Sequence, residues 1–72
     1  DGVARDPARA AYWFEKAATQ GYKLAQCNLG GMYAHGAGIE RNAARAAYWY
    51  GKAAAQGDEE AKRVLARGTP TR

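Results

Sequence analysis

A thirteen-residue phrase occurs twice in this chain. Residues 9–21 read RAAYWFEKAATQG, and residues 45–57 return as RAAYWYGKAAAQG at an offset of 36. Aligned with itself at that offset, the chain matches at 15 of 36 positions, and 13 of these matches fall within residues 2–21. A period of about 20–50 residues is the signature of repeat proteins, whose units stack one on the next. The duplication therefore predicts a building block rather than a catalytic site.

The composition favours helices and excludes several classes of protein. Alanine, the best helix former, supplies 18 of the 72 residues. Cys27 is the only cysteine, so an internal disulfide is impossible, and no cysteine–histidine cluster indicates a zinc site. No apolar run reaches the roughly 20 residues that cross a bilayer. The net charge of +4 permits an anionic partner without requiring one.

Helix start and stop signals divide each unit into two helices. Asp6, followed by Pro7, and Asn42 are suitable N-caps, because their side chains can accept hydrogen bonds from free amides of the first turn. Gly21 and Gly57 are suitable helix ends, because glycine tolerates the left-handed conformation. We expect an all-α fold with four helices, antiparallel between sequence neighbours, near 7–20, 23–35, 43–56 and 58–67.

Helical periodicity predicts which side chains are buried. The expected buried stripe of the first helix contains Ala10, Trp13, Phe14 and Ala17, and that of the third contains Ala46, Trp49, Tyr50 and Ala53. The second helix contributes Ala25, Leu29 and Met32, with Tyr33 at the margin, and Ala11, Ala18 and Gly30 are small flanking residues. Tyr12 and Tyr48 fall outside the stripes.

Residues 23–57 resemble one full Sel-one-like repeat, a relative of the tetratricopeptide repeat found in bacteria and eukaryotes. The positions that carry the resemblance are Ala25, Leu29-Gly30, Tyr33, Gly36, Gly38, Asn42, Arg45-Ala46, Trp49-Tyr50, Lys52-Ala53-Ala54 and Gln56-Gly57. In the preceding unit, Trp13, Phe14 and Gly21 occupy the matching places. The resemblance implies an α-solenoid of helix pairs that acts as a non-catalytic scaffold for protein interactions.

The resemblance also implies a division of the chain. Residues 2–21 match the back half of one unit, 22–57 a full unit and 58–67 the start of another, and 68–72 form a tail, of which we expect residues 69–72 to be frayed. Asn42 and Arg45 replace the usual Asp and Lys, Ala66 replaces a Gly, and Thr69 stands where Tyr is usual. Because DEEAKR dominates the last helix, we interpret it as a polar end cap.

The candidates for catalysis have simpler interpretations. Cys27 and His35 are separated by eight residues of one helix, about 12 Å along its axis, which is beyond hydrogen-bond reach. Asp58, Glu59 and Glu60 could suggest a metal or acid–base site, but acidic residues at a helix start complement its positive end. We therefore predict no enzyme, no metal and no cofactor needed for folding.

Two surfaces remain as candidates for binding. The first is a stripe on the second predicted helix, with counterparts on the fourth, and we predict that it contacts a peptide or protein partner. Its residues are Leu24, Asn28, Gly31 and His35, with Glu60, Val64 and Arg67 as counterparts. The second repeats a basic and aromatic pattern in Arg9, Tyr12 and Lys16 and in Arg45, Tyr48 and Lys52. It offers an alternative function, binding of nucleic acid or another polyanion, although nucleic acid is the less favoured partner. A small enzyme or a binder of cell-wall sugars is a third, weaker interpretation.

The first unit contains only its second helix. Trp13, Phe14 and the edge at Ala11 are therefore expected to lack part of their cover. We predict that the 72-residue chain is weakly stable or self-associates through this end, and that further repeats added before Asp1 raise its melting temperature.

Overall fold

The computed structural model describes residues 6–68 and contains four helices. They are α2 (Pro7–Thr19), α3 (Lys23–His35), α4 (Ala43–Ala55) and α5 (Glu59–Gly68), and the described residues contain no strand. The expected all-α architecture is confirmed, with helix ends within one residue of their predicted positions. Gly68 is the last residue of α5, and the predicted fraying of residues 69–72 lies outside the described residues.

Side-chain caps explain where three of the helices begin. The Asp6 carboxylate accepts a hydrogen bond from the Arg9 amide at 3.3 Å, and the Asn42 side chain accepts one from Arg45 at 3.0 Å. The Asp58 carboxylate accepts from the Ala61 amide at 2.9 Å. Each bond satisfies an amide that has no partner within its helix.

Glycines with positive φ separate the helices. Gly21 and Gly57 have φ of 100° and 94°, and Gly36, at the end of α3, has φ of 75°. These values lie in the region that favours glycine, so the chain can reverse after each helix without strain. Gly38 has a second constraint, because a Cβ there would overlap the backbone of Pro7.

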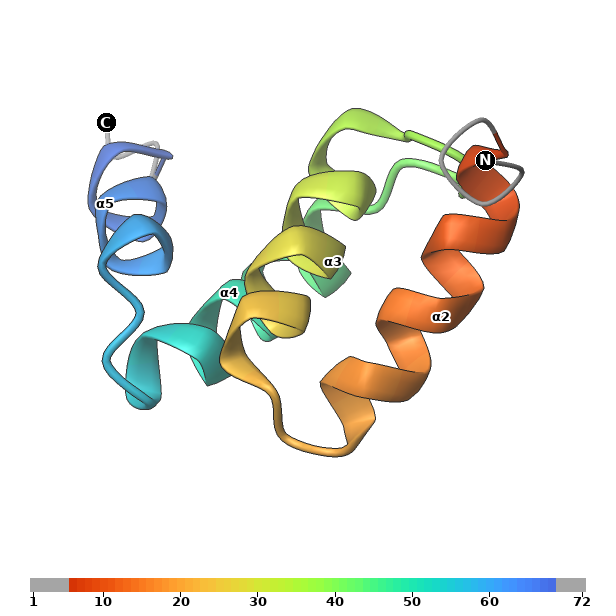
Figure 1. The fold of residues 1–72 in the computed structure, drawn as a ribbon. Coiled ribbons are helices and arrows are strands. Elements are labelled where there is room, and N and C mark those ends of the chain that lie inside the picture. The colour runs from red at the N-terminus through yellow and green to blue at the C-terminus, as the bar shows by residue number, and fades with distance from the viewer. Residues whose placement is uncertain (1–5, 69–72) are drawn as a thin grey trace.

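The helices form a short row. α3 packs against both α2 and α4, and α4 also packs against α5. Figure 1 shows α2 and α5 at opposite ends, with α2 and α3 running antiparallel. The molecule measures 39 × 23 × 16 Å along its principal axes. This is the arrangement expected of a solenoid segment.

The core lies where α3 meets its two neighbours and continues to α5. Its buried residues are Ala18, Ala25, Leu29, Tyr33, Ala46, Tyr50, Ala53 and Ala61. A Cβ at Gly30 would lie 3.0 Å from the Tyr50 ring, so the absence of a side chain lets the two helices approach closely. The predicted stripes of α3 and α4 are thus largely confirmed.

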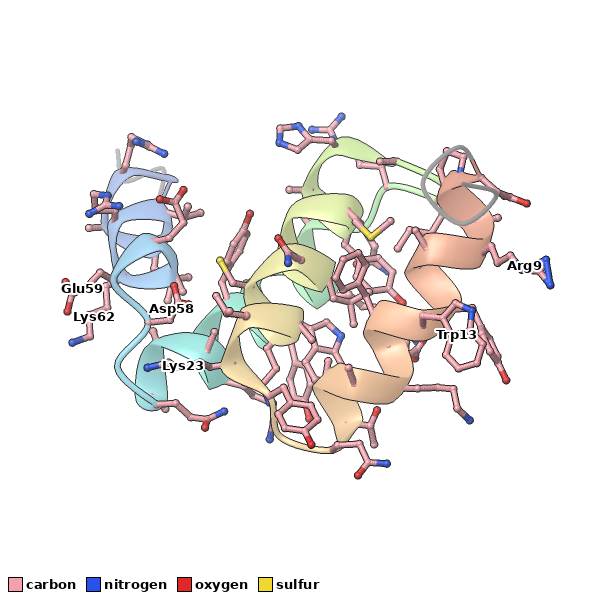
Figure 2. The ribbon with its side chains drawn as sticks, in the orientation of Figure 1. Arg9, Trp13, Lys23, Asp58, Glu59 and Lys62 are labelled. Atoms are coloured by element: carbon pink, nitrogen blue, oxygen red, sulfur yellow. The ribbon has the colours of Figure 1, made fainter. Side chains whose placement is uncertain are left out.

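Trp13 is not buried as its place in the predicted stripe requires, but the prediction that Trp13 and Phe14 lack part of their cover is confirmed. The prediction that Ala11 lacks cover is wrong. Trp13 is 51% exposed, whereas Ala11 is only 3% exposed and Ala18 is also buried. The small edge of α2, rather than its aromatic stripe, is therefore the part that is fully covered. In Figure 2, Arg9 and Trp13 project from the outer side of α2, away from α5.

Candidate functional site

An apolar groove of about 410 Å³ runs between α2 and α3. Its lining residues are Ala10, Trp13, Phe14, Ala17, Tyr22, Leu24, Ala25 and Asn28. Trp13, Tyr22 and Leu24 are among the most exposed large hydrophobic side chains of the described residues. Single exposed hydrophobic residues are ordinary, but several that gather around one groove are typical of a binding surface.

The repeat shows what kind of object fits this groove. Ala46, Tyr50 and Ala53 of α4 are buried and belong to the core that includes α3. Their counterparts 36 residues earlier, Ala10, Phe14 and Ala17, are only partly buried and line the groove. The groove therefore corresponds to the position that α3 occupies on α4, one unit earlier in the row.

The seven predicted partner-binding residues fall into separate groups. Leu24, which is 70% exposed, and Asn28 line the α2–α3 groove. Gly31 lies beside the Tyr50 hydroxyl, since a Cβ on it would be 3.2 Å from that oxygen. His35 is exposed at the end of α3.

The three counterparts on α5 also differ from one another. Burial is the main cause that raises the pKa of the Tyr50 phenol; the charges of Cys27 and Glu60 raise it further, and the charge of Arg67 lowers it. Val64 is partly buried against the core. The structure therefore brings Gly31, Glu60 and Arg67 towards one phenol, which is separate from the groove.

Sequence reasoning missed Trp13 and Tyr22 as groove residues. Trp13 was assigned to the buried stripe by its helical period and was expected to lack part of its cover, but it was not predicted to contact a partner. Tyr22 could have been noticed, because its counterpart in the next unit is Asp58 and a large apolar side chain before α3 breaks the repeat. An aromatic residue at a place where the other copy is charged is a signal of a specific contact.

The basic and aromatic pattern is present, but not as one continuous face. Lys16 lies 5.4 Å from the centre of the Tyr12 ring, and Lys52 lies 5.5 Å from that of Tyr48. The Arg45 guanidinium instead lies 5.8 Å from the centre of the Tyr33 ring and donates a long hydrogen bond, 3.5 Å, to its hydroxyl. This arginine is therefore engaged away from the tyrosine–lysine pair of its own helix.

The acidic start of α5 is accounted for by local contacts. Asp58 caps the helix, Glu59 pairs with Lys62 at 3.6 Å, and Glu60 pairs with Arg63 at 2.9 Å. Figure 2 shows Glu59 and Lys62 on the outer side of α5 and Asp58 on the side towards α3. Within residues 6–68, no group of three His, Cys, Asp or Glu side chains is placed to hold a metal ion. Nor does that part of the chain contain a helix long and apolar enough to cross a membrane.

Cys27 is poorly suited to be a nucleophile. The pKa of its thiol is raised to about 11, mainly by burial and to a smaller extent by the charge of Asp58, a hydrogen bond with Asp58 and the charge of Glu60. Because the thiolate is the reactive form, a raised pKa keeps this cysteine unreactive near neutral pH.

We therefore expect slow alkylation of Cys27 by iodoacetamide at pH 8. A pKa of about 11 rather than 9.0 lowers the thiolate fraction about 100-fold. Asp58→Asn should raise the rate a few-fold, because it removes a charge while asparagine still caps α5. The same linkage predicts that the free energy of unfolding falls as the pH rises from 9 towards 11, where the unfolded thiol ionises first. Equal alkylation rates for folded and urea-unfolded chains at pH 8 would contradict the assignment.

Comparison with known proteins places this geometry in a family. The Sel1 repeat family matches residues 1–22 and 23–58. A crystal structure of a Sel1 repeat protein from Oxalobacter formigenes is similar, with a TM-score of 0.84 and 44% sequence identity, covering 86% of this chain and 18% of that one. A search of the curated proteins gives no match. With two consecutive matches over residues 1–58 and four helices stacked in a row, the chain belongs to the Sel1 repeat family.

Proposed function

We propose that this chain is a non-catalytic protein-binding module whose α2–α3 groove takes an amphipathic helix of a partner. The contrast between the two copies of one stripe carries the proposal. On α4 the stripe lies under a helix, whereas on α2 the same stripe lines an apolar groove. Binding of a helix in a groove uses regularly spaced apolar anchors, which α3 itself presents to α4.

The partner helix should resemble α3 in the face that it presents. α3 contributes Leu29, which is fully buried, to the core that it shares with α4, and its Gly30 lies against the Tyr50 ring. The equivalent ring on α2 is Phe14, so the partner is expected to present a glycine, or no more than a small side chain, to Phe14. Asn28 provides a polar group at the edge of the groove.

A second copy of this chain is the weaker candidate for this position. α5 is the repeat counterpart of α3, but it carries Ala66 where α3 has Gly30. A Cβ at that place lies 3.0 Å from the facing ring in the α3–α4 pair, a contact that forces the neighbours apart. Lys62 also replaces the buried Gln26. A helix from another protein or another repeat therefore fits better than α5.

The other predicted contacts, Gly31, His35, Glu60, Val64 and Arg67, lie outside this groove. Of these, His35 is exposed at the end of α3, where a longer partner segment that leaves the groove along α3 would reach it. Its affinity would depend on a few anchors, with the remaining contacts adding little.

A peptide copy of residues 22–36 provides the test. Added to the ¹⁵N-labelled chain, it should shift the amide resonances of Ala10, Phe14 and Ala17, with a Kd of about 0.1–1 mM. We expect weak binding because a helix this short is mostly unfolded when free and must order on binding. Trp13→Glu should abolish the shifts.

Two controls make this result specific. Tyr12→Glu changes a neighbour that is equally exposed but outside the groove, and it should leave binding unchanged. A peptide carrying Leu29→Asp should not bind. Groove resonances that stay unshifted at millimolar peptide, or an equal loss with Tyr12→Glu, would refute the proposal.

A further inference from the structure

A second groove, of about 550 Å³, is lined by the C-terminal end of α2, the α2–α3 turn and Gln26 of α3, and by α4 with the residue that follows it. Thr19 and Gln26 line it from one side, and Tyr48, Trp49, Lys52 and Gln56 line it from the other. None of these residues lines the α2–α3 groove. No acidic residue lines this second groove.

Hydrogen bonds between helices hold one part of this groove in a fixed geometry. The Gln56 Nε2 donates to the Gly21 carbonyl at 2.7 Å and to the Gln26 Oε1 at 2.9 Å. Gln26, which is buried, donates in turn to the Ala18 carbonyl at 3.1 Å. Both amide protons of Gln56 are thus used, while its Oε1 accepts no hydrogen bond from the described residues and remains available as an acceptor.

The opposite part of the groove is aromatic and carries one cation. The Tyr48 and Trp49 rings meet edge to face with their centres 5.0 Å apart, and Lys52 lies over the Tyr48 ring. Lys52 forms no ion pair with a described carboxylate, since both ion pairs within residues 6–68 lie on α5. The positive charge of the groove is therefore not neutralised by the part of the chain that the structure describes.

We propose that this groove binds an acidic peptide segment. A carboxylate would pair with Lys52, a backbone N–H would donate to the Gln56 oxygen, and an apolar side chain would pack on Trp49. An extended peptide offers these three groups together. A nucleic acid is disfavoured, because its affinity grows with the number of phosphates that are neutralised and the groove presents a single lysine. This site is independent of the helix-binding groove.

The chain contains a matched control for this proposal. Lys16 lies over Tyr12, and the Tyr12 and Trp13 rings meet at 5.1 Å, so α2 repeats the arrangement of lysine and aromatic rings. However, neither Tyr12 nor Lys16 lines either groove. Lys52→Gln and Lys16→Gln therefore remove the same charge from the same local arrangement, but only Lys52 lines a groove.

The test uses short peptides and the resonance of the Trp49 indole N–H in the ¹⁵N-labelled full chain. Three probes are acetyl-Gly-Leu-Asp-Leu-Gly-amide, its Asn counterpart, and acetyl-Gly-Leu-Leu with a free C-terminal carboxylate. We expect the Asp peptide to shift this resonance and the Asn peptide to bind about threefold to fivefold more weakly, the range of one exposed ion pair. Binding of the third peptide but not of the Asp peptide would show that the groove takes the carboxylate of a chain end, and would overturn the proposal of an acidic segment.

The lysine variants complete the test. Lys52→Gln should weaken binding of the Asp peptide by the same factor, while Lys16→Gln leaves it unchanged. Failure of the Asp peptide to shift the Trp49 indole resonance in the unaltered chain would overturn the proposal without reference to any variant. It would also be overturned by equal effects of the two lysine substitutions, or by oligothymidylate that binds more tightly than the peptides with a steep dependence on salt. None of these outcomes bears on the helix-binding groove, which is probed separately at Ala10, Phe14 and Ala17.

Discussion

Replacing Leu29 with alanine is expected to lower the free energy of unfolding by about 2–5 kcal/mol. Leu29 is fully buried where α3 meets its neighbours, at 0% exposure. The substitution removes apolar burial and leaves a cavity that the neighbouring helices fill only in part. Because small domains have little stability to spare, this single change should unfold a large fraction of the chain at 25 °C.

A matched leucine on the same helix provides the control. Leu24 is 70% exposed, and Leu24→Ala should change the free energy of unfolding by no more than about 0.5 kcal/mol. Urea denaturation followed by circular dichroism measures both. If Leu29→Ala unfolds the chain outright, Leu29→Met, which nearly conserves volume, should still fold with a loss below about 1.5 kcal/mol. Equal effects at the two leucines would contradict the placement of Leu29 in the core between α3 and its neighbours.

Local signals in the sequence were sufficient to predict the helices. Asp6 and Asn42 cap the helices that they were expected to cap, and Gly21 and Gly57 have the positive φ values expected at helix ends. These features depend on neighbours within one turn, so a single sequence contains the necessary information. The 36-residue offset then predicts the stacking, because equivalent segments adopt equivalent structures.

Burial was predicted less well, because it depends on what lies beside a residue in space. Trp13 and Trp49 occupy the same place in the repeat, yet the side chain of Trp13 is exposed and that of Trp49 is partly buried. The helical period is identical for the two and cannot distinguish them; only the missing first helix of the first unit predicted that Trp13 would lack part of its cover. The difference arises because α3 covers this side of α4, whereas the same side of α2 faces the open α2–α3 groove.

Neither groove could be located from periodicity. The α2–α3 groove includes Leu24 and Asn28 from the predicted stripe, but its aromatic residues Trp13 and Tyr22 were not expected there. The second groove depends on where the end of α2 lies relative to α4, a relation between segments about 30 residues apart. Such distances follow from packing rather than from the pattern of one helix.

A copy of residues 22–36 joined directly before Asp1 is expected to stabilise the chain. The join keeps the repeat register, because residues 1–5 take the places of 37–41 in the next unit and Gly2 and Arg5 match Gly38 and Arg41. The added helix would cover Ala10, Phe14 and Ala17 as α3 covers their counterparts on α4. Burying one aromatic side chain contributes about 1.5–3 kcal/mol, which corresponds to a rise of roughly 10 °C in the melting temperature of a small domain.

The added helix needs its own control, because any extra segment can change a melting temperature. A second extended chain carries aspartate in the added copy at the place of Leu29. This variant has the same length and nearly the same composition, but it places a carboxylate where a buried leucine is required. It should melt close to the temperature of the original 72-residue chain.

The melting temperature of the extended chain is therefore the most direct test of the central claim, that the α2–α3 groove is a binding position for a helix like α3. We predict that the extended chain melts about 10 °C above the original chain and above its aspartate control, and that the fluorescence of Trp13, isolated with Trp49→Phe in every chain, moves to shorter wavelength as the groove is covered. An unchanged melting temperature, or an equal rise in the aspartate control, would contradict the claim.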